Sequence, residues 1–296
     1  MDTLSLRLFL RVAELGSVSA AARDLSLSPA SASARLSKLE DTVGFRLFNR
    51  TTRAVSPTSD GAAFIPYAQQ SLETLQDGLN TIRGSAADAK GLLRITMPGS
   101  FGRMHIIPCL AEFKRRHPQI TLDLRLSDEM LDVVEGAYDL IIRNAPLSDS
   151  SLIARKLATD RRLLLASPDY LERCGTPSSP EDLQNHRCVI LSERYRLKFQ
   201  NGAIIPLPKT FLVNDGEAMR LLIESGAGIG ISSLWSAHKS LQNSKLKEIL
   251  PETPLQTDSS IWALYPGNRI VSPKVRAMID FLLERFWPVP PWEQEP

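Results

Sequence analysis

The chain has 296 residues, of which 43% are hydrophobic and 23% are charged. At about 100–200 residues per domain, this length predicts two or three domains, and the composition excludes disorder as the dominant state. The net charge is only +2, so a basic surface that binds nucleic acid would have to be local.

The sequence shows none of the usual features of a secreted or membrane protein. Its three cysteines are odd in number and widely spaced, so we expect buried free thiols in a reducing cytosol, at Cys109, Cys174 and Cys188. No apolar run approaches the ~18 residues of a membrane span. Asp2, Arg7 and Arg11 interrupt the N-terminal apolar stretch, which argues against a signal peptide. We therefore expect a cytoplasmic protein with no membrane partner.

The first part of the chain is predicted to be helical. Apolar residues at helical spacing predict a first helix over Leu4–Leu15. Ser19 is expected to cap a short second helix over Ala20–Leu25. Ser28 can cap a third helix over Pro29–Val43, whose proline occupies the favourable first position. The second and third helices are separated by a three-residue turn, which is the spacing of a helix-turn-helix.

The third helix has one apolar stripe and one face of mostly small side chains. The stripe consists of Ala32, Leu36, Leu39 and Val43. The other side presents Ala30, Ser31, Ser33, Ala34, Arg35, Ser37 and Lys38. A helix that reads a DNA groove needs such a face, because small side chains let its backbone approach the bases. An ordinary solvated amphipathic helix would show the same pattern, so this helix alone leaves both interpretations open.

Positive charge is concentrated in the segment that follows. Arg46, Arg50 and Arg53 lie close together with no acidic residue between them. Residues 1–57 contain eight basic and five acidic residues, a net of +3 that exceeds the charge of the whole chain. Asn49, Thr51 and Thr52 add neutral donors, and such groups suit phosphate oxygens. A merely solvated charged face is the alternative, but the position beside a helix-turn-helix favours DNA binding.

Several motifs in this region occur together. They are Ala21-Ala22, Ser28-Pro29, Ser33, Leu39-Glu40, Gly44, the run Leu47-Phe48-Asn49-Arg50-Thr51-Thr52-Arg53, and Thr58 with Gly61. The combination closely resembles the DNA-binding domain of LysR-type transcriptional regulators. Two departures are Ala34, where the family often has a long polar or basic side chain, and Pro57, where leucine usually precedes the threonine.

The resemblance implies an all-α winged helix-turn-helix over residues 1–58. Its partner would be double-stranded DNA with a partly symmetric operator. The implied contact residues lie on the third helix and the wing: Ser28, Pro29, Ala30, Ser31, Ser33, Ala34, Arg35, Lys38, Arg50, Thr51, Thr52 and Arg53. Of these, Arg50 and Arg53 are expected to hold phosphates.

A long linker helix is expected within residues 59–90. Apolar residues spaced 3, 4, 3, 4 and 3 apart predict a seam that pairs with another helix: Ile65, Ala68, Leu72, Leu75, Leu79 and Ile82. Pro66 predicts a kink or a later start, and residues 84–87 read as a hinge. The family uses this segment for dimerisation, which implies a homodimer or a tetramer. The alternative is an amphipathic helix that lies on its own domain.

After residue 90 the pattern becomes α/β. Strands are predicted at 92–97, 120–126, 139–143, 162–166, 211–213 and 229–232, and helices at 101–116, 128–136, 217–225 and 273–286. This alternation predicts parallel doubly wound sheets. Two such lobes, approximately 91–161 plus 268–290 and 162–267, resemble the two-lobed periplasmic-binding-protein-like effector domain of LysR-type regulators, here over residues 91–296.

Ligands of open α/β sheets bind at the carboxyl ends of strands. Ser100 and Arg143 follow or end such strands and are predicted to bind an anion, with Phe101 as an apolar wall. The resemblance places effectors between the lobes, near positions that match Ser100, Ser127, Val213 and Asn214. We therefore expect a small, partly apolar carboxylate as effector, with no cofactor and no metal. As alternatives, Ser100 and Asn214 would be helix caps and Arg143 a surface ion pair.

Two other motifs imitate catalytic or cofactor sites. Gly226–Gly230 is rich in glycine but precedes a strand, so it is predicted to be a helix end and turn. Ser236 and Lys239 match the S-x-x-K pattern without its companion motifs. The prediction is therefore not an enzyme but a sequence-specific, effector-controlled transcriptional regulator, with RNA polymerase as a further partner. The rivals are a binding protein without a DNA role and a hydrolase built on Ser236 and Lys239.

Overall fold

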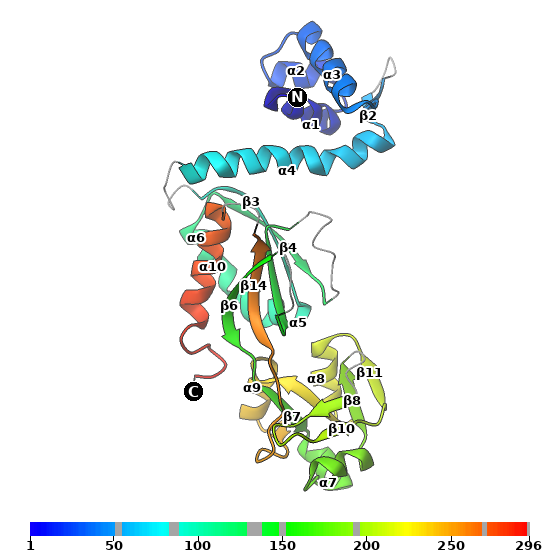
Figure 1. Cartoon of the computed structure of the whole chain (residues 1–296), viewed down its shortest axis with the longest axis vertical. Coiled ribbons are helices and arrows are strands. Elements are labelled where there is room, and N and C mark those ends of the chain that lie inside the picture. The colour runs from blue at the N-terminus through cyan, green and yellow to red at the C-terminus, as the bar shows by residue number, and fades with distance from the viewer. Residues whose placement is uncertain are drawn as a thin grey trace. The chain divides into compact units, whose positions relative to one another are not determined.

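The structure is a computed structural model that describes residues 1–50, 55–82, 89–128, 138–147, 152–191, 196–267 and 271–294. The chain divides into two compact units, Met1–Ser85 and Ala86–Pro296 (Figure 1). Within the described ranges, none of the helices combines the length and hydropathy that crossing a membrane would require.

Three helices form the first part of the N-terminal unit: α1 (Thr3–Leu15), α2 (Val18–Asp24) and α3 (Pro29–Val43). Ser28 caps α3 as predicted, because its side-chain oxygen accepts the backbone N–H of Ser31 at 3.2 Å. The predicted cap of the second helix, Ser19, is wrong. Ser17 accepts the N–H of Ala20 at 3.2 Å, since Ser17 has the extended backbone that a cap requires and Ser19 lies inside the helix.

A carboxylate on α3 shapes the segment that follows this helix. Glu40 accepts the backbone N–H groups of Leu47 at 2.8 Å and Phe48 at 3.2 Å. These bonds hold the start of β1 (Phe48–Arg50), which pairs antiparallel with β2 (Val55–Pro57). The glutamate of the predicted motif therefore has a structural role in placing the wing strands.

The helix α4 (Ser59–Ile82) begins earlier than predicted. Thr58 receives the N–H of Gly61 on its hydroxyl at 2.9 Å, which caps the helix, so the predicted late start at Pro66 is wrong. Pro66 lies inside α4, where it removes one backbone hydrogen bond without ending the helix. Gly61 lies so close to Leu47 that a Cβ would be 2.0 Å from the carbonyl oxygen of Leu47, which explains the glycine of the motif.

The first lobe of the C-terminal unit is built on a five-stranded sheet of order β4-β3-β5-β14-β6 (Figure 1). Its strands are β3 (Gly91–Met97), β4 (Ile120–Leu126), β5 (Leu140–Ala145), β6 (Leu152–Thr159) and β14 (Ser260–Pro266). β3 is parallel to β4 and β5 as predicted, but β14 is antiparallel to β5 and β6. The sheet is mixed because β14 is the returning strand from the second lobe. The first lobe therefore resumes at Ser260 and not at 268.

The second lobe has a five-stranded sheet of order β11-β8-β12-β7-β13. Its strands are β7 (Arg162–Ala166), β8 (Cys188–Leu191), β11 (Phe211–Val213), β12 (Ile229–Ser233) and β13 (Lys247–Glu248). β11, β8 and β12 are parallel, whereas β7 is antiparallel to β12 and β13. A short antiparallel pair, β9 (Arg196–Lys198) and β10 (Ile204–Pro206), is attached to this lobe.

The helices of the C-terminal unit are α5 (Gly99–Phe101), α6 (Leu110–Arg116), α7 (Pro168–Cys174), α8 (Gly216–Glu224), α9 (Leu234–Gln242) and α10 (Pro273–Phe286). The predicted helix over 101–116 is interrupted by a π-helical turn, Gly102–Ile106, and a 3₁₀ turn, Ile107–Cys109. Pro108 explains the interruption, because it has no N–H to continue an α-helix. The predicted last helix is confirmed as α10. The predicted hinge at 84–87 and, apart from its first residue, the helix over 128–136 lie outside the described residues.

Cysteine burial follows the prediction at two of three positions. Cys109 and Cys188 are buried, and burial raises the pKa of the Cys188 thiol to about 12. Cys174 is exposed, because it ends α7 and only Tyr170 of that helix is buried. The expectation of a buried thiol is therefore wrong for Cys174.

Candidate functional site

The predicted DNA-reading face of α3 is the solvent face of that helix. Ala32, Leu36 and Leu39 are buried in the core of the N-terminal unit. The exposed residues are Ser28, Pro29, Ala30, Ser31, Ala34, Ser37 and Lys38, while Ser33 and Arg35 are half-buried. The surface that α3 offers to a partner is therefore narrow, made mostly of small side chains, and carries one lysine.

Arg35 has a partner within its own unit. Its Nη1 lies 3.0 Å from Oδ2 of Asp2, the cap of α1. The pKa of Asp2 is lowered, first by the backbone N–H of Ser5 and further by Arg35. Arg35 thus links α3 to the start of α1, a role that the sequence analysis missed; its role near base edges stays a prediction.

The segment after α3 is anchored by two buried side chains. Leu47 and Phe48 are 2% and 3% exposed, and the ring of Phe48 packs 5.3 Å from that of Phe9. Arg46 and Asn49 are exposed beside this anchor. The side chain of Arg50 and the predicted contacts Thr51, Thr52 and Arg53 lie outside the described residues, so their roles stay predictions.

The predicted dimer seam on α4 has two different halves. Ala68 is only 1% exposed, and Ile65 and Leu72 pack against the core of their own unit. Leu75 and Leu79 are 49% and 43% exposed. Ala68 therefore cannot serve a partner helix, because its side chain is already covered. The side chain of Ile82 lies outside those that the structure describes.

A cavity of about 210 Å³ lies between the two lobes of the C-terminal unit, and we call it the polar cavity. Four of the six predicted effector residues line it: Ser100, Ser127, Arg143 and Asn214. They meet there because β3, β4, β5 and β11 all end at this side of their sheets. The sequence analysis missed other polar lining residues, namely Asp128, Asn144, Arg162, Ser232, Ser233 and Ser236.

The wall of the polar cavity contains polar atoms with unused hydrogen-bonding capacity. The Oδ1 of Asn144, the Nε1 of Trp235 and the Oγ of Ser236 are buried and have no hydrogen-bond partner among the described residues. Buried polar atoms are normally paired, so such groups in a cavity wall point to a ligand. Together they can donate and accept hydrogen bonds to a polar molecule.

The charges around the polar cavity favour an anion. Arg143 is half-buried, and burial lowers the pKa of its guanidinium, opposed by nearby Asp128. Burial raises the pKa of Asp128, opposed by the backbone N–H of Gly99. Arg162 contributes a second guanidinium, whose Nε lies 2.6 Å from the fully buried Asp160 carboxylate. Both arginines retain a positive charge in a partly desolvated wall, which favours a negatively charged ligand.

Two of the predicted effector residues do not line this cavity. Phe101 is fully buried and packs edge-on against Trp235, with ring centroids 5.1 Å apart. The short α5 turns it into the core of the first lobe, so the predicted apolar wall is wrong. Val213 is half-buried against the core of the second lobe, and only its neighbour Asn214 reaches the cavity.

The alternative roles of these polar residues as helix caps are not supported. Ser100 is the second residue of α5, whose cap position is Pro98. Asn214 precedes the actual cap of α8, Asp215, whose carboxylate accepts the N–H of Ala218 at 2.8 Å. Ser100 and Asn214 are therefore available to a ligand as far as helix capping is concerned.

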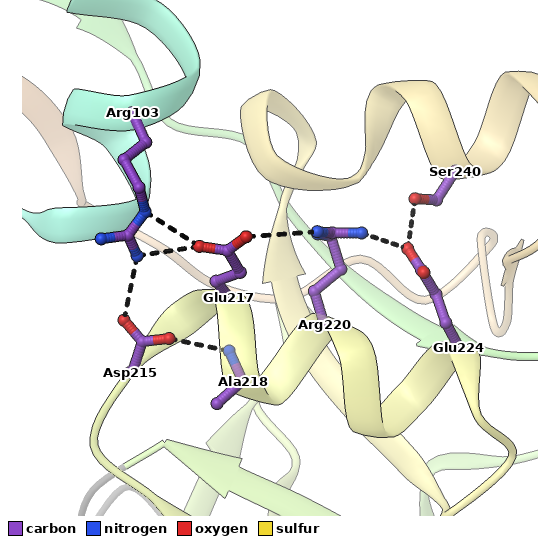
Figure 2. A network of polar contacts seen from close by, with 7 residues as sticks. All are labelled: Arg103, Asp215, Glu217, Ala218, Arg220, Glu224 and Ser240. Carbon is purple, nitrogen blue, oxygen red and sulfur yellow. Dashed lines mark hydrogen bonds and ion pairs between the residues drawn. The ribbon is translucent and has the colours of Figure 1, made fainter. Parts of the chain in front are cut away.

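A network of charged side chains connects the two lobes beside the polar cavity (Figure 2). Arg103 of the first lobe lies 2.8 Å from the Glu217 carboxylate and 3.7 Å from that of Asp215, both at the start of α8. Glu217 in turn contacts Arg220 at 4.0 Å, and Arg220 pairs with Glu224. The sequence analysis considered Asp215 only as a cap, although the spacing from 217 to 224 is typical of charge pairs on one helix face.

The backbone also approaches closely at this point. A Cβ on Gly216 would lie 3.1 Å from the Oγ of Ser100, which is on the opposite lobe. Gly216 and the Arg103 contacts therefore set how closely the lobes meet at one side of the polar cavity.

The Ser236–Lys239 pair does not form a nucleophile and base. Ser236 is 4% exposed and its hydroxyl has no hydrogen-bond partner in the described part of the chain, while Lys239 is exposed. An activated serine needs a base within about 2.6–3.2 Å. Ser236 is instead part of the polar cavity wall.

Two family models match almost the whole chain. Residues 4–62 match "Bacterial regulatory helix-turn-helix protein, lysR family", and residues 86–287 match "LysR substrate binding domain". An HTH-type transcriptional regulator of Xanthomonas campestris pv. campestris is 35% identical over 96% of this chain and 84% of its own length. The HTH-type transcriptional regulator DmlR of Escherichia coli is 32% identical over 95% and 93%.

Solved structures show the same architecture. CrgA, a LysR-type transcriptional regulator from Neisseria meningitidis, aligns with a TM-score of 0.63 at 30% identity, covering 96% of this chain and 98% of CrgA. The Vibrio cholerae virulence activator AphB aligns with a TM-score of 0.58 at 27% identity, covering 96% and 99%. The helix-turn-helix and the two-lobed domain therefore occur together in these proteins too.

Proposed function

Because the chain belongs to the LysR family of DNA-binding transcriptional regulators, we propose that α3 and the following wing contact double-stranded DNA while a small anion occupies the polar cavity. The N-terminal unit is the DNA-binding domain, and the C-terminal unit is the effector-binding domain. The residues that carry each task, the effector and the assembly are the parts that we propose here.

On the DNA side, α3 lies in the major groove with Ser31 and Ala34 nearest the base edges. Small, exposed side chains let a helix backbone approach the bases, and Lys38 adds a phosphate contact on the same face. Arg50 and Arg53 hold phosphates on the wing. Base contacts would provide specificity and phosphate contacts would provide register and most of the affinity.

Two chains pair through the exposed half of the α4 seam, formed by Leu75 and Leu79. Such a dimer places two copies of α3 on one duplex, so its operator would be a partly symmetric repeat. We expect this regulator to act in the cytoplasm, as a dimer or tetramer, and to affect transcription through contact with RNA polymerase.

The polar cavity is the proposed effector site, and the observation that carries this proposal is its lining. Two arginines stand against one aspartate, beside buried polar atoms that have no partner within the described chain. Such a wall fits a small molecule that has an anionic group and further hydrogen-bonding groups. Closure of the lobes around it would change the placement of the DNA-binding units.

Calorimetric titration of the full-length chain with succinate tests this proposal. Arg143→Ala removes a charged hydrogen-bond donor and should weaken binding roughly tenfold to a hundredfold, whereas Ser100→Ala should cost at most about tenfold. Arg155→Ala is the matched control, because Arg155 is exposed on β6 and is not part of the cavity lining. Equal affinities in all three variants would place the site elsewhere, and binding of cationic ligands alone would refute an anionic effector.

A further inference from the structure

A second cavity, of about 370 Å³, lies in the second lobe next to the polar cavity, and we call it the apolar cavity. Its size is within the range of small-molecule sites. The lining is dominated by aliphatic side chains from β8, β9 and β12 and from the segments after β10 and before β14: Val189, Ile190, Leu197, Leu207, Ile231 and Leu255. Nothing in the function described so far uses this space.

The two cavities adjoin. Arg162, Leu191 and Met219 line both of them. Leu191 is the last residue of β8 and Arg162 the first of β7, so the shared wall is the edge of the sheet where α/β proteins bind ligands. A single molecule with two chemically different ends can therefore extend from one cavity into the other.

Charge accompanies the apolar lining. Arg162, Arg196 and Lys198 belong to the wall of the apolar cavity, against one acidic residue, Asp258. Arg196 and Lys198 are exposed on β9 on either side of the buried Leu197. This excess of positive charge favours an anion whose body is apolar, and it disfavours a hydrophobic cation.

We propose that the effector is an amphipathic anion, with its carboxylate-type head in the polar cavity and an apolar body in the apolar cavity. This inference rests on the proposed role of the polar cavity. It also supplies the apolar contact that Phe101 cannot make, since that ring is fully buried in the core of the first lobe. The head would lie near Arg143 and Arg162, and the body would pass the shared side chains of Leu191 and Met219.

The chain length of straight-chain carboxylates tests the inference. Butanoate, hexanoate and octanoate carry the same head with an apolar chain of increasing length. With the full-length chain, the affinity measured by calorimetry should rise about fourfold for each added methylene, the fold-change that corresponds to about 0.8 kcal/mol per buried methylene. An affinity that does not change from butanoate to octanoate would overturn the proposal.

A pair of matched variants locates the effect. Gln256→Trp adds a large ring at the wall of the apolar cavity, whereas Gln242→Trp makes the same change at the end of α9, outside the lining of either cavity. Both glutamines are exposed, so both variants should fold, which thermal denaturation checks. Gln256→Trp should lose at least tenfold of the gain from butanoate to octanoate, and Gln242→Trp should keep it. The same gain in both variants would place the apolar body elsewhere.

Succinate separates failure of this inference from failure of the proposed function. Arg143-dependent binding of succinate without any chain-length gain would leave the polar cavity as the effector site and reject the apolar one. Absence of binding by succinate and by all three alkanoates would reject both. Octanoate should also lose at least tenfold in affinity in Arg143→Ala, because its head depends on that guanidinium.

Discussion

The DNA-binding surface and the polar cavity differ in how their charges meet water. The α3 face is exposed and its lysine is solvated, so charges there act over a distance and are screened by salt. In the polar cavity, Arg143 is half-buried and Arg162 holds a fully buried carboxylate, so each group acts locally and strongly. The first surface should therefore respond gradually to ionic strength, and the cavity should respond to single side chains.

The largest predicted effect concerns the exposed half of the α4 seam, because it separates what α4 does for its own unit from what it does for a partner. Leu75→Asp with Leu79→Asp should place charges in the dimer contact, at a cost of several kcal/mol, and yield monomers. Folding should be retained, since both leucines are exposed in the single chain. Analytical ultracentrifugation of the full-length chain measures the outcome.

The matched control for the seam is Ala63→Asp with Gln69→Asp. These residues are exposed on the same helix but fall outside the 3-4 spacing, so this variant should remain dimeric. A Leu75→Asp, Leu79→Asp variant that still dimerises would show that α4 does not pair the chains.

The seam illustrates how far the sequence alone can predict such sites. A 3-4 spacing identifies the apolar side of α4 but cannot say which part of it faces its own domain, because Leu72 and Leu75 follow the same pattern. Ser28 was predictable, since a cap depends only on its own few residues. The ends of β3, β4, β5 and β11 were also predictable, which is why Ser100, Ser127, Arg143 and Asn214 were found.

Other parts of the cavity depend on contacts between distant segments. Arg162, Ser232 and Ser233 reach the polar cavity because β7 runs antiparallel to β12, and no local pattern encodes that pairing. Phe101 was misplaced because the chain leaves regular α-helical geometry directly after it, at Gly102. The interruption depends on packing as well as on Pro108.

A second prediction concerns pH and the contact between the lobes. His105 of the first lobe donates from Nε2 to the carbonyl of Trp235 at 2.9 Å, and burial lowers the pKa of His105 to about 4. The unfolded chain binds this proton near pH 6.5, so stability that is present above pH 6.5 should be lost as the pH falls towards 4. The expected loss from this group is about 2 kcal/mol between pH 7.5 and pH 5.

Urea unfolding of wild type and His105→Gln at both pH values measures this contribution. The difference in unfolding free energy between the two pH values should be about 2 kcal/mol smaller in the variant. The same pH dependence in both proteins would mean that His105 is not held neutral by burial.

A smaller effect is expected from the bridge between the lobes (Figure 2). Arg103 and Glu217 are 46% and 39% exposed at their side chains, so water screens their attraction. A double-mutant cycle with Arg103→Ala and Glu217→Gln should give a coupling of about 0.2–1 kcal/mol in unfolding free energy. A coupling above about 2 kcal/mol would show that this exposed bridge behaves like the buried charges of the cavity.

The salt dependence of DNA binding tests most directly whether the wing and α3 form a DNA-binding surface of this kind. The affinity of the full-length chain for duplex DNA should be measured over a range of salt concentrations, without effector, for wild type and for Arg50→Ala, Arg53→Ala and the control Arg155→Ala. Each wing variant should reduce the slope of log affinity against log salt by about 0.9, one phosphate contact, while the control keeps the wild-type slope. Unchanged slopes in both wing variants, or an equal reduction in the control, would contradict the account.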